Sequence, residues 1–223
     1  MKKLFVLLCV CFCAQLFSSE TVFLLIRHGQ TDWNIEDRAQ GHTNNPLNER
    51  GMMQAKNLAE RIASSHSDIT SIYSSDLDRA YTTAQETAKK LNLEVEKRES
   101  LREINNGAAE GLTLDEEELL YGPALQELNK RYPHRQERWN YTHIPNAETN
   151  HQLLHRIKNE LMLIEASHKG EKVAVFAHGE IIKVLIADIL DTENIPPIPN
   201  CAVVQIVYSS DTQAHPFTFI AVE

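Results

Sequence analysis

Long apolar runs separated by amphipathic stretches give the chain an alternating pattern. Thr21–Ile26 is a continuous apolar run with β-branched residues, which is typical of a strand buried on both faces of a sheet. Lys172–Ala177 has the same character. Shorter runs of the same kind predict four further strands, at 69–73, 93–97, 201–208 and 217–222.

Between these runs, apolar residues recur at helical spacing. The pattern predicts amphipathic helices over Asn48–Ser64 and Thr149–Ser167, and an apolar helix over Glu180–Leu190. Asp76 marks the start of a predicted helix that ends at Leu91. Residues 114–132 predict one helix, or two helices broken at Gly122-Pro123.

Strands that alternate with helices predict an α/β protein in three α/β/α layers around a mostly parallel central sheet. No internal repeat, linker or charge run interrupts residues 20–223, so we expect a single domain over that range. The least regular stretch, 107–150, is expected to be an insertion over the edge of the sheet.

The first nineteen residues have the pattern of a secretory signal peptide. Basic Met1-Lys2-Lys3 is followed by apolar Leu4–Phe17 and then by polar Ser18-Ser19. This run is shorter than the roughly 20 residues of a membrane-spanning helix, so no stable membrane span is expected. The pattern predicts export to the periplasm or the medium if the signal is cleaved, and a cytoplasmic protein otherwise. The alternative is an N-terminal core strand or helix.

Composition changes this picture in two respects. Of four cysteines only Cys201 lies outside the leader, so no internal disulfide is expected. The formal net charge is −9; without residues 1–19, which carry Lys2 and Lys3 and no acid, 20 basic and 31 acidic residues leave −11. This charge excludes bulk binding of nucleic acid, although a local basic pocket for an anion remains possible. No pattern indicates an oligomeric state.

Chemically reactive side chains follow several of the predicted strands. Arg27 and His28 come directly after the first strand, Arg79 and Glu103 follow the second and third, and His178 follows 172–177. The carboxyl ends of parallel strands share one edge of a sheet, so these residues are expected to meet. Arginines bind phosphate oxygens, histidine is a nucleophile toward phosphorus, and a carboxylic acid protonates a leaving oxygen.

Five sequence blocks carry a family resemblance. They are LLIRHGQTDWN (24–34), QGHTNNPLNERGMMQA (40–55), SSDLDRAYTTA (74–84), LREINNG (101–107) and AHGEIIKVLIADIL (177–190). In content and order they resemble the histidine phosphatase superfamily, the cofactor-dependent phosphoglycerate mutase-like proteins, over about residues 20–208. The resemblance implies a phosphoglycerate mutase-like fold.

The resemblance also implies roles for individual residues. His28 is the nucleophile that becomes phosphohistidine, Glu103 is the proton donor to the leaving alcohol and later the base toward water, and His178 donates to the transferring group. The substrate-binding positions are Arg27, Arg79, Thr31, Asn34 and Gly179.

No metal and no other cofactor are expected. Two arginines and an imidazolium replace the magnesium that phosphoryl transfer otherwise uses, and no metal-ligand cluster is evident in the sequence. The nucleophilic His28 must present a neutral nitrogen, so we expect a backbone carbonyl to hold the proton of its other nitrogen.

These residues predict a metal-independent phosphomonoester hydrolase that acts on a small phosphorylated substrate. A mutase of the phosphoglycerate mutase type is the alternative, and a non-catalytic phosphate- or protein-binding member is a third. Mutases that resemble this family carry a longer insertion between the acid and the second histidine. Here Glu103 and His178 are 75 positions apart, which favours hydrolysis.

Some positions depart from the family pattern. Asn44, Asn105-Asn106 and Ala109 stand where acidic or aromatic residues are common, so the pocket wall near Glu103 is expected to differ from that of relatives. Glu180 stands where a small or neutral residue is common. A basic run that contains Arg131, Arg135 and Arg138 is either a solvated helix face or a second anion site.

Overall fold

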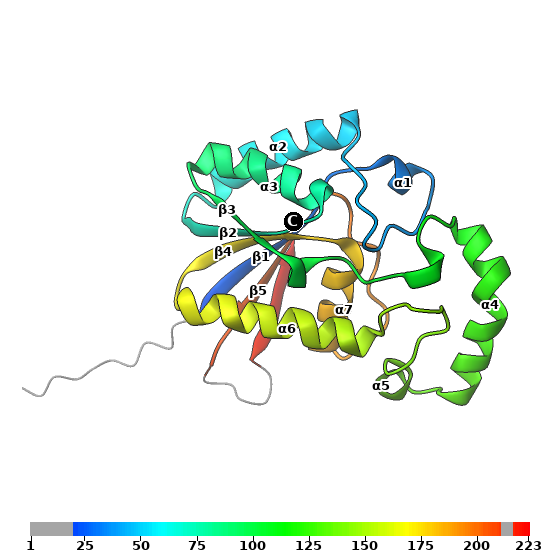
Figure 1. The fold of residues 1–223 in the computed structure, drawn as a ribbon. Coiled ribbons are helices and arrows are strands. Elements are labelled where there is room, and N and C mark those ends of the chain that lie inside the picture. The colour runs from blue at the N-terminus through cyan, green and yellow to red at the C-terminus, as the bar shows by residue number, and fades with distance from the viewer. Residues whose placement is uncertain (1–19, 211–215) are drawn as a thin grey trace, which may run out of the picture.

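The structure is a computed structural model that describes residues 20–210 and 216–223. The predicted signal peptide, 1–19, lies outside the described residues. Six strands form one sheet in the order β3-β2-β4-β1-β5-β6 (Figure 1). Their bounds are β1 Thr21–Arg27, β2 Ile69–Ser75, β3 Val95–Arg98, β4 Lys172–Ala177, β5 Val203–Tyr208 and β6 Phe217–Val222.

The sheet is mostly parallel, as predicted. β3, β2, β4 and β1 run parallel to one another, while β5 pairs antiparallel with both β1 and β6. The sequence of β1 is continuously apolar because the strand is buried on both faces of the sheet. Leu24 and Ile26 contribute to the core on one face, and Phe23 and Leu25 contribute to the core on the other. All four of these side chains are buried.

Helices cover both faces, which confirms the three layers (Figure 1). Leu58 of α2 and Ala84 of α3 share a buried cluster with Ile26 on one face. Leu161 of α6 and Ile181 of α7 share the other cluster with Leu25. The helix bounds are α1 Asp32–Ile35, α2 Glu49–Ser65, α3 Asp78–Leu91, α4 Leu114–Arg131, α5 Arg135–Arg138, α6 Asn150–Ser167 and α7 Gly179–Ile189, with short 3₁₀ turns η1 at Glu99–Leu101 and η2 at Gly107–Ala109.

Of the two predictions for residues 114–132, the single helix is confirmed, because α4 runs through Gly122-Pro123 without a break. Pro123 removes only the hydrogen bond to the carbonyl of Leu119, and Leu119 is 80% exposed, so water reaches this region of the helix. A capping box at Thr113 and Glu116 fixes the start of α4.

The 107–150 insertion lies over the edge of the sheet at which the parallel strands end (Figure 1). The segment does not cover β3 or β6, the two edge strands; it lies beyond the carboxyl ends of the strands (Figure 1). Leu114 and Glu117 of α4 line the same cleft as His28. The segment therefore forms one wall of that cleft.

Asp76 does not begin α3, which starts two residues later than predicted. Its carboxylate instead accepts hydrogen bonds from Nε and Nη2 of Arg102. The cap comes from a distant residue, because Oδ1 of Asn44 accepts from the backbone N–H of Asp78 at 2.8 Å. The neutral side chain at position 44 thus ties the 41–45 loop to the start of α3.

Two simpler predictions concern membranes and thiols. Within the ranges that the structure describes, no helix has the length and apolar character needed to cross a bilayer. Cys201 is a free thiol, and burial raises its pKa to about 11. It therefore stays protonated at neutral pH.

Candidate active site

His28 follows the last residue of β1 and is buried beneath the carboxyl edge of the sheet. Its Nδ1 lies 2.7 Å from the carbonyl oxygen of Gly29. A carbonyl only accepts, so Nδ1 carries the proton and donates it, and Nε2 retains a free lone pair. The backbone carbonyl expected from the sequence is therefore present, and it leaves Nε2 as the nucleophilic atom.

His178 follows β4 and is the N-cap residue of α7. Its ring centroid lies 5.2 Å from that of His28. Nε of Arg79 donates to Nδ1 of His178 at 3.2 Å, so the proton of the neutral ring sits on Nε2. That Nε2 is buried and has no hydrogen-bond partner among the described residues. The two histidines thus present opposite groups, a lone pair on one and a free N–H on the other.

Two guanidinium groups lie beside this pair. Arg79 is fully buried and donates from Nη1 to the carbonyl of Thr43 and from Nη2 to that of Gly41, both at 2.8 Å. Arg27 donates from Nη1 to the carbonyl of Ile198, and its buried Nε has no described partner. All of these hydrogen bonds go to neutral acceptors. The two positive charges are therefore available to an anion.

Burial shifts the pKa values of these four groups. It lowers the pKa of Arg79 to about 10 and also lowers that of Arg27, so both remain charged at neutral pH. Burial, together with the charge of Arg79, lowers the pKa of His28 and of His178 well below the ordinary value. The expectation of an imidazolium is wrong for the free enzyme, because His178 is a neutral N–H donor there.

Glu103 lies across the cleft, after η1. Its Oε1 accepts from the backbone N–H groups of Ile104 and Ile181, and its Oε2 from that of Glu180, at 3.0–3.1 Å. Burial and the neighbouring carboxylate of Glu180 raise the pKa of Glu103 and outweigh these donors and the charge of Arg79. A carboxyl group with a raised pKa is suited to proton donation.

The cleft itself has a volume of about 660 Å³. Arg27, His28, Arg79 and Glu103 line it, with Asn34 and Gly179, while His178 is fully buried beside His28. Two of the predicted site residues, His178 and Thr31, are absent from the lining. Thr31 is fully buried, and its hydroxyl caps α1 by accepting from the N–H of Asn34. Its contribution to the site is to orient Asn34.

Arg79 is held by a loop that no sequence pattern predicted. The carboxylate of Glu110 accepts from the backbone N–H groups of His42 and Thr43 and from the Thr43 hydroxyl. This fixes the loop whose carbonyls bind Arg79. Gly41 has φ +51°, and a Cβ there would lie 2.1 Å from Oε1 of Glu110. The one sequence signal for this loop is Gly41, because glycine often occupies a position with positive φ. Glu110 lies 68 positions from His42, and no local sequence pattern connects the two.

Arg131, Arg135 and Arg138 do not line the cleft. Arg135 donates to the carbonyl of Ala187 at 2.9 Å and pairs with Asp191. Arg138 pairs with Glu193. The structure thus favours a structural role over a second anion site for Arg135 and Arg138, which attach α5 to the end of α7 and the residues that follow it.

His42 borders the site, because its Nε2 donates to the carbonyl of Glu103 at 3.0 Å. Over residues 20–210 and 216–223, no three histidine, cysteine or acidic side chains lie close enough together to hold a metal ion.

A three-layer fold with two histidines and two arginines at one edge of the sheet defines a histidine-based phosphate site. The chain belongs to the histidine phosphatase superfamily (branch 1), whose family model matches residues 23–215. Phosphoglycerate mutase-like protein 4 of Arabidopsis thaliana is 36% identical, over 76% of this chain and 73% of that protein. The metal-independent phosphoserine phosphatase of the same plant is 33% identical, over 83% and 76%.

The structural likeness extends over nearly the whole chain. The crystal structure of phosphoglycerate mutase from Bacillus anthracis superimposes with a TM-score of 0.77 and 31% identity. The likeness covers 92% of this chain and 93% of that one. The phosphoglycerate mutase-like fold is therefore confirmed.

Proposed function

We propose that this protein is a metal-independent phosphomonoesterase that works through a phosphohistidine at Nε2 of His28. The observation that carries the proposal is the pairing of this free lone pair with two guanidinium groups, one partly and one fully buried, that bind only neutral acceptors. A phosphoryl group needs in-line attack and neutralisation of its equatorial oxygens. The site offers Nε2 of His28 for the in-line attack, and the guanidinium groups of Arg27 and Arg79 for neutralisation of the oxygens.

In the first step, Nε2 of His28 attacks phosphorus and the bond to the ester oxygen breaks. Arg27, Arg79 and the free Nε2–H of His178 stabilise the charge on the equatorial oxygens. Glu103 gives its proton to the departing oxygen and becomes a carboxylate. The products are an alcohol and phosphohistidine.

In the second step, water attacks the phosphorus of the intermediate. The Glu103 carboxylate accepts a proton from this water, and the bond between phosphorus and Nε2 breaks. Inorganic phosphate leaves, and His28 returns to its neutral tautomer because Nδ1–H has stayed on the carbonyl of Gly29 throughout. Glu103 is again protonated, so the cycle closes.

The charges of the cleft wall favour hydrolysis over mutase chemistry. A mutase must hold a second anionic group so that the phosphoryl group returns to the substrate. The cleft has two further cations, Arg38 and Lys183. Arg38 pairs with Glu36 at 2.7 Å, and Lys183 lies 3.2 Å from Glu180. Neither is left for a second anion.

The relatives' names include both activities, so the first test compares them directly. The purified protein and His28→Ala are incubated in EDTA with phosphoserine, other phosphomonoesters, and 3-phosphoglycerate with a trace of 2,3-bisphosphoglycerate. Phosphorus NMR follows the products. Phosphate that is released only by the protein with His28 supports the proposal, whereas 2-phosphoglycerate as the main product contradicts it. Binding without turnover would support a non-catalytic member.

We further propose that residues 1–19 are a signal peptide and that the exported domain begins near residue 20. The basic start and short apolar run support this. N-terminal sequencing of the protein recovered from the periplasm or medium of a bacterial host tests it. An intact Met1 on all of the protein would contradict the proposal.

A further inference from the structure

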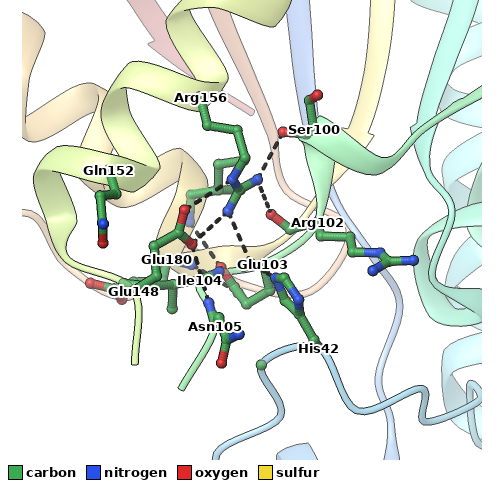
Figure 2. Close-up of polar contacts among 12 residues, drawn as sticks. His42, Ser100, Arg102, Glu103, Ile104, Asn105, Glu148, Gln152, Arg156 and Glu180 are labelled. Carbon is green, nitrogen blue, oxygen red and sulfur yellow. Dashed lines mark hydrogen bonds and ion pairs between the residues drawn. The ribbon is translucent and has the colours of Figure 1, made fainter. Parts of the chain in front are cut away.

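Arg156 of α6 binds the main chain that carries Glu103 (Figure 2). Its Nη1 donates to the carbonyls of Ser100 and Arg102, both at 2.8 Å. Its Nη2 donates to the carbonyl of Glu103 at 3.2 Å. One guanidinium group thus binds three carbonyls within a span of four residues. Arg156 lines a separate pocket together with His42 and Glu148, and not the cleft that holds His28.

Glu148 holds this guanidinium in place. Its Oε1 accepts from Nε of Arg156 at 3.0 Å, and its Oε2 accepts from Nη2 at 2.7 Å. Such a two-point contact fixes the plane of the guanidinium as well as its position. The side chains of Arg156 and Glu148 are only 22% and 14% exposed, so solvent screens the pair little.

Glu148 also binds the chain just after Glu103. Its Oε2 accepts from the N–H of Asn105 at 3.2 Å, and its own N–H donates to the carbonyl of Asn105 at 2.8 Å. Nε2 of His42 also donates to the carbonyl of Glu103. Arg156, Glu148 and His42 therefore hold five backbone atoms of the main chain from 100 to 105, and from this stretch Glu103 and Ile104 line the cleft.

We infer that Arg156 and Glu148 are positioning residues for the proton donor Glu103. The inference rests on the proposed function, because it assigns them a role in the step in which Glu103 protonates the leaving oxygen. Proton transfer depends steeply on the separation and direction of the two oxygens. The network sets both, because it fixes the main chain from which the Glu103 carboxyl group reaches into the cleft.

This role has a kinetic signature that general loss of structure lacks. An alkoxide is a poor leaving group and needs the proton of Glu103, whereas p-nitrophenolate leaves without one. For an enzyme with a phosphohistidine, kcat/KM reports only the steps up to formation of that intermediate. A misplaced proton donor therefore lowers kcat/KM for an alkyl phosphate and spares that for p-nitrophenyl phosphate.

The experiment measures both kcat/KM values for the purified full chain and its variants, with phosphoserine or whichever alkyl phosphate the protein hydrolyses best. Arg156→Met is expected to lower the alkyl value by about 100-fold and the p-nitrophenyl value by less than about threefold. Glu148→Gln, which keeps the shape but loses the charge, is expected to lower the alkyl value by about tenfold. Arg156→Lys is expected to rescue only part of the loss, because one ammonium group does not reach three carbonyls.

Arg102→Met is the matched control. It removes an arginine–carboxylate pair from the same loop and leaves the contacts of Arg156 in place. The ratio of the two kcat/KM values is expected to stay at the wild-type level. Circular dichroism checks the fold of each variant, and Glu148→Gln decides alone if Arg156→Met does not fold. Equal losses on both substrates would overturn the inference, whereas a wild-type protein inactive on both would overturn the proposed function instead.

Discussion

Nε of Arg79 donates to Nδ1 of His178 at 3.2 Å, and both side chains are fully buried. This single contact decides which nitrogen of His178 carries the proton. A guanidinium only donates, so Nδ1 must accept. The proton of the neutral ring is therefore on Nε2. Arg79 thus acts twice at the site: it supplies positive charge, and it sets the tautomer of a second donor.

Arg79→Lys keeps a positive charge but loses this arrangement. One ammonium group is not expected to satisfy Gly41, Thr43 and His178 together, as the guanidinium does. We expect kcat/KM for a phosphomonoester to fall roughly 10²- to 10³-fold, the usual effect of losing a preorganised donor. Steady-state kinetics measures this. Arg98→Lys, at an arginine that pairs with Glu96, is the control, and a similar loss in both variants would contradict the assignment.

Glu103→Gln separates the two roles of this carboxyl group. With p-nitrophenyl phosphate the first step needs no proton donor, so His28 is still phosphorylated. The amide is no base toward water, so hydrolysis of the intermediate is expected to slow about 10²-fold or more. Rapid-mixing absorbance should then show a burst of p-nitrophenolate close to one equivalent per active site. Absence of the burst, with a slow steady rate from the start, would count against a covalent intermediate.

The carboxylate of Glu180 predicts a pH effect. It is second only to burial in raising the pKa of Glu103. Glu103 must be protonated to act as the acid, so kcat/KM for an alkyl phosphate falls as pH rises through that pKa. Glu180→Gln removes the repulsion and lowers the pKa of Glu103, so this falling limb is expected to move to lower pH.

The control for this effect is Glu117→Gln. Glu117 also lines the cleft and is not a cause of the Glu103 shift. Its replacement should leave the falling limb where it is. Profiles measured for wild type and both variants on the same alkyl phosphate decide the matter, and a shift of the limb toward higher pH in Glu180→Gln would refute the electrostatic argument.

The sequence predicted the sheet and most of the site because both depend on local signals. Apolar runs mark β1 and β4, and the reactive residues that follow parallel strands meet at one edge. His28, Glu103 and His178 were found in this way and through the family resemblance. The sequence left open whether α4 is broken at Gly122-Pro123, and it is not, because an exposed helix tolerates one lost hydrogen bond at Pro123.

What the sequence did not predict depends on contacts between distant segments. The protonated nitrogen of His178 is set by Arg79, 99 positions away, and Arg156 reaches carbonyls 53 to 56 positions away. Local patterns carry no information on such pairs. The neutral state of His178 likewise depends on its complete burial beside Arg79, which only the packed structure provides.

Replacement by alanine is expected to have different effects at Gly29 and Gly179, the two glycines that directly follow the catalytic histidines. A Cβ on Gly179 would lie 3.2 Å from Nε of Arg27, a side chain that binds the phosphoryl group in the proposed mechanism. A Cβ on Gly29 would lie 2.6 Å from the backbone oxygen of Gly51. A side chain shifts by a few tenths of an ångström at small cost, whereas the backbone of α2 does not.

Gly179→Ala is therefore expected to keep its stability, helped by the better helix propensity of alanine at the start of α7, and to lose roughly tenfold in kcat/KM because Arg27 is displaced. Gly29→Ala is expected to lose about 1–3 kcal/mol of unfolding free energy. Thermal unfolding and steady-state kinetics on both variants test this pair. A destabilised Gly179→Ala with normal kinetics would show that the space beside Arg27 serves folding and not the binding of phosphate.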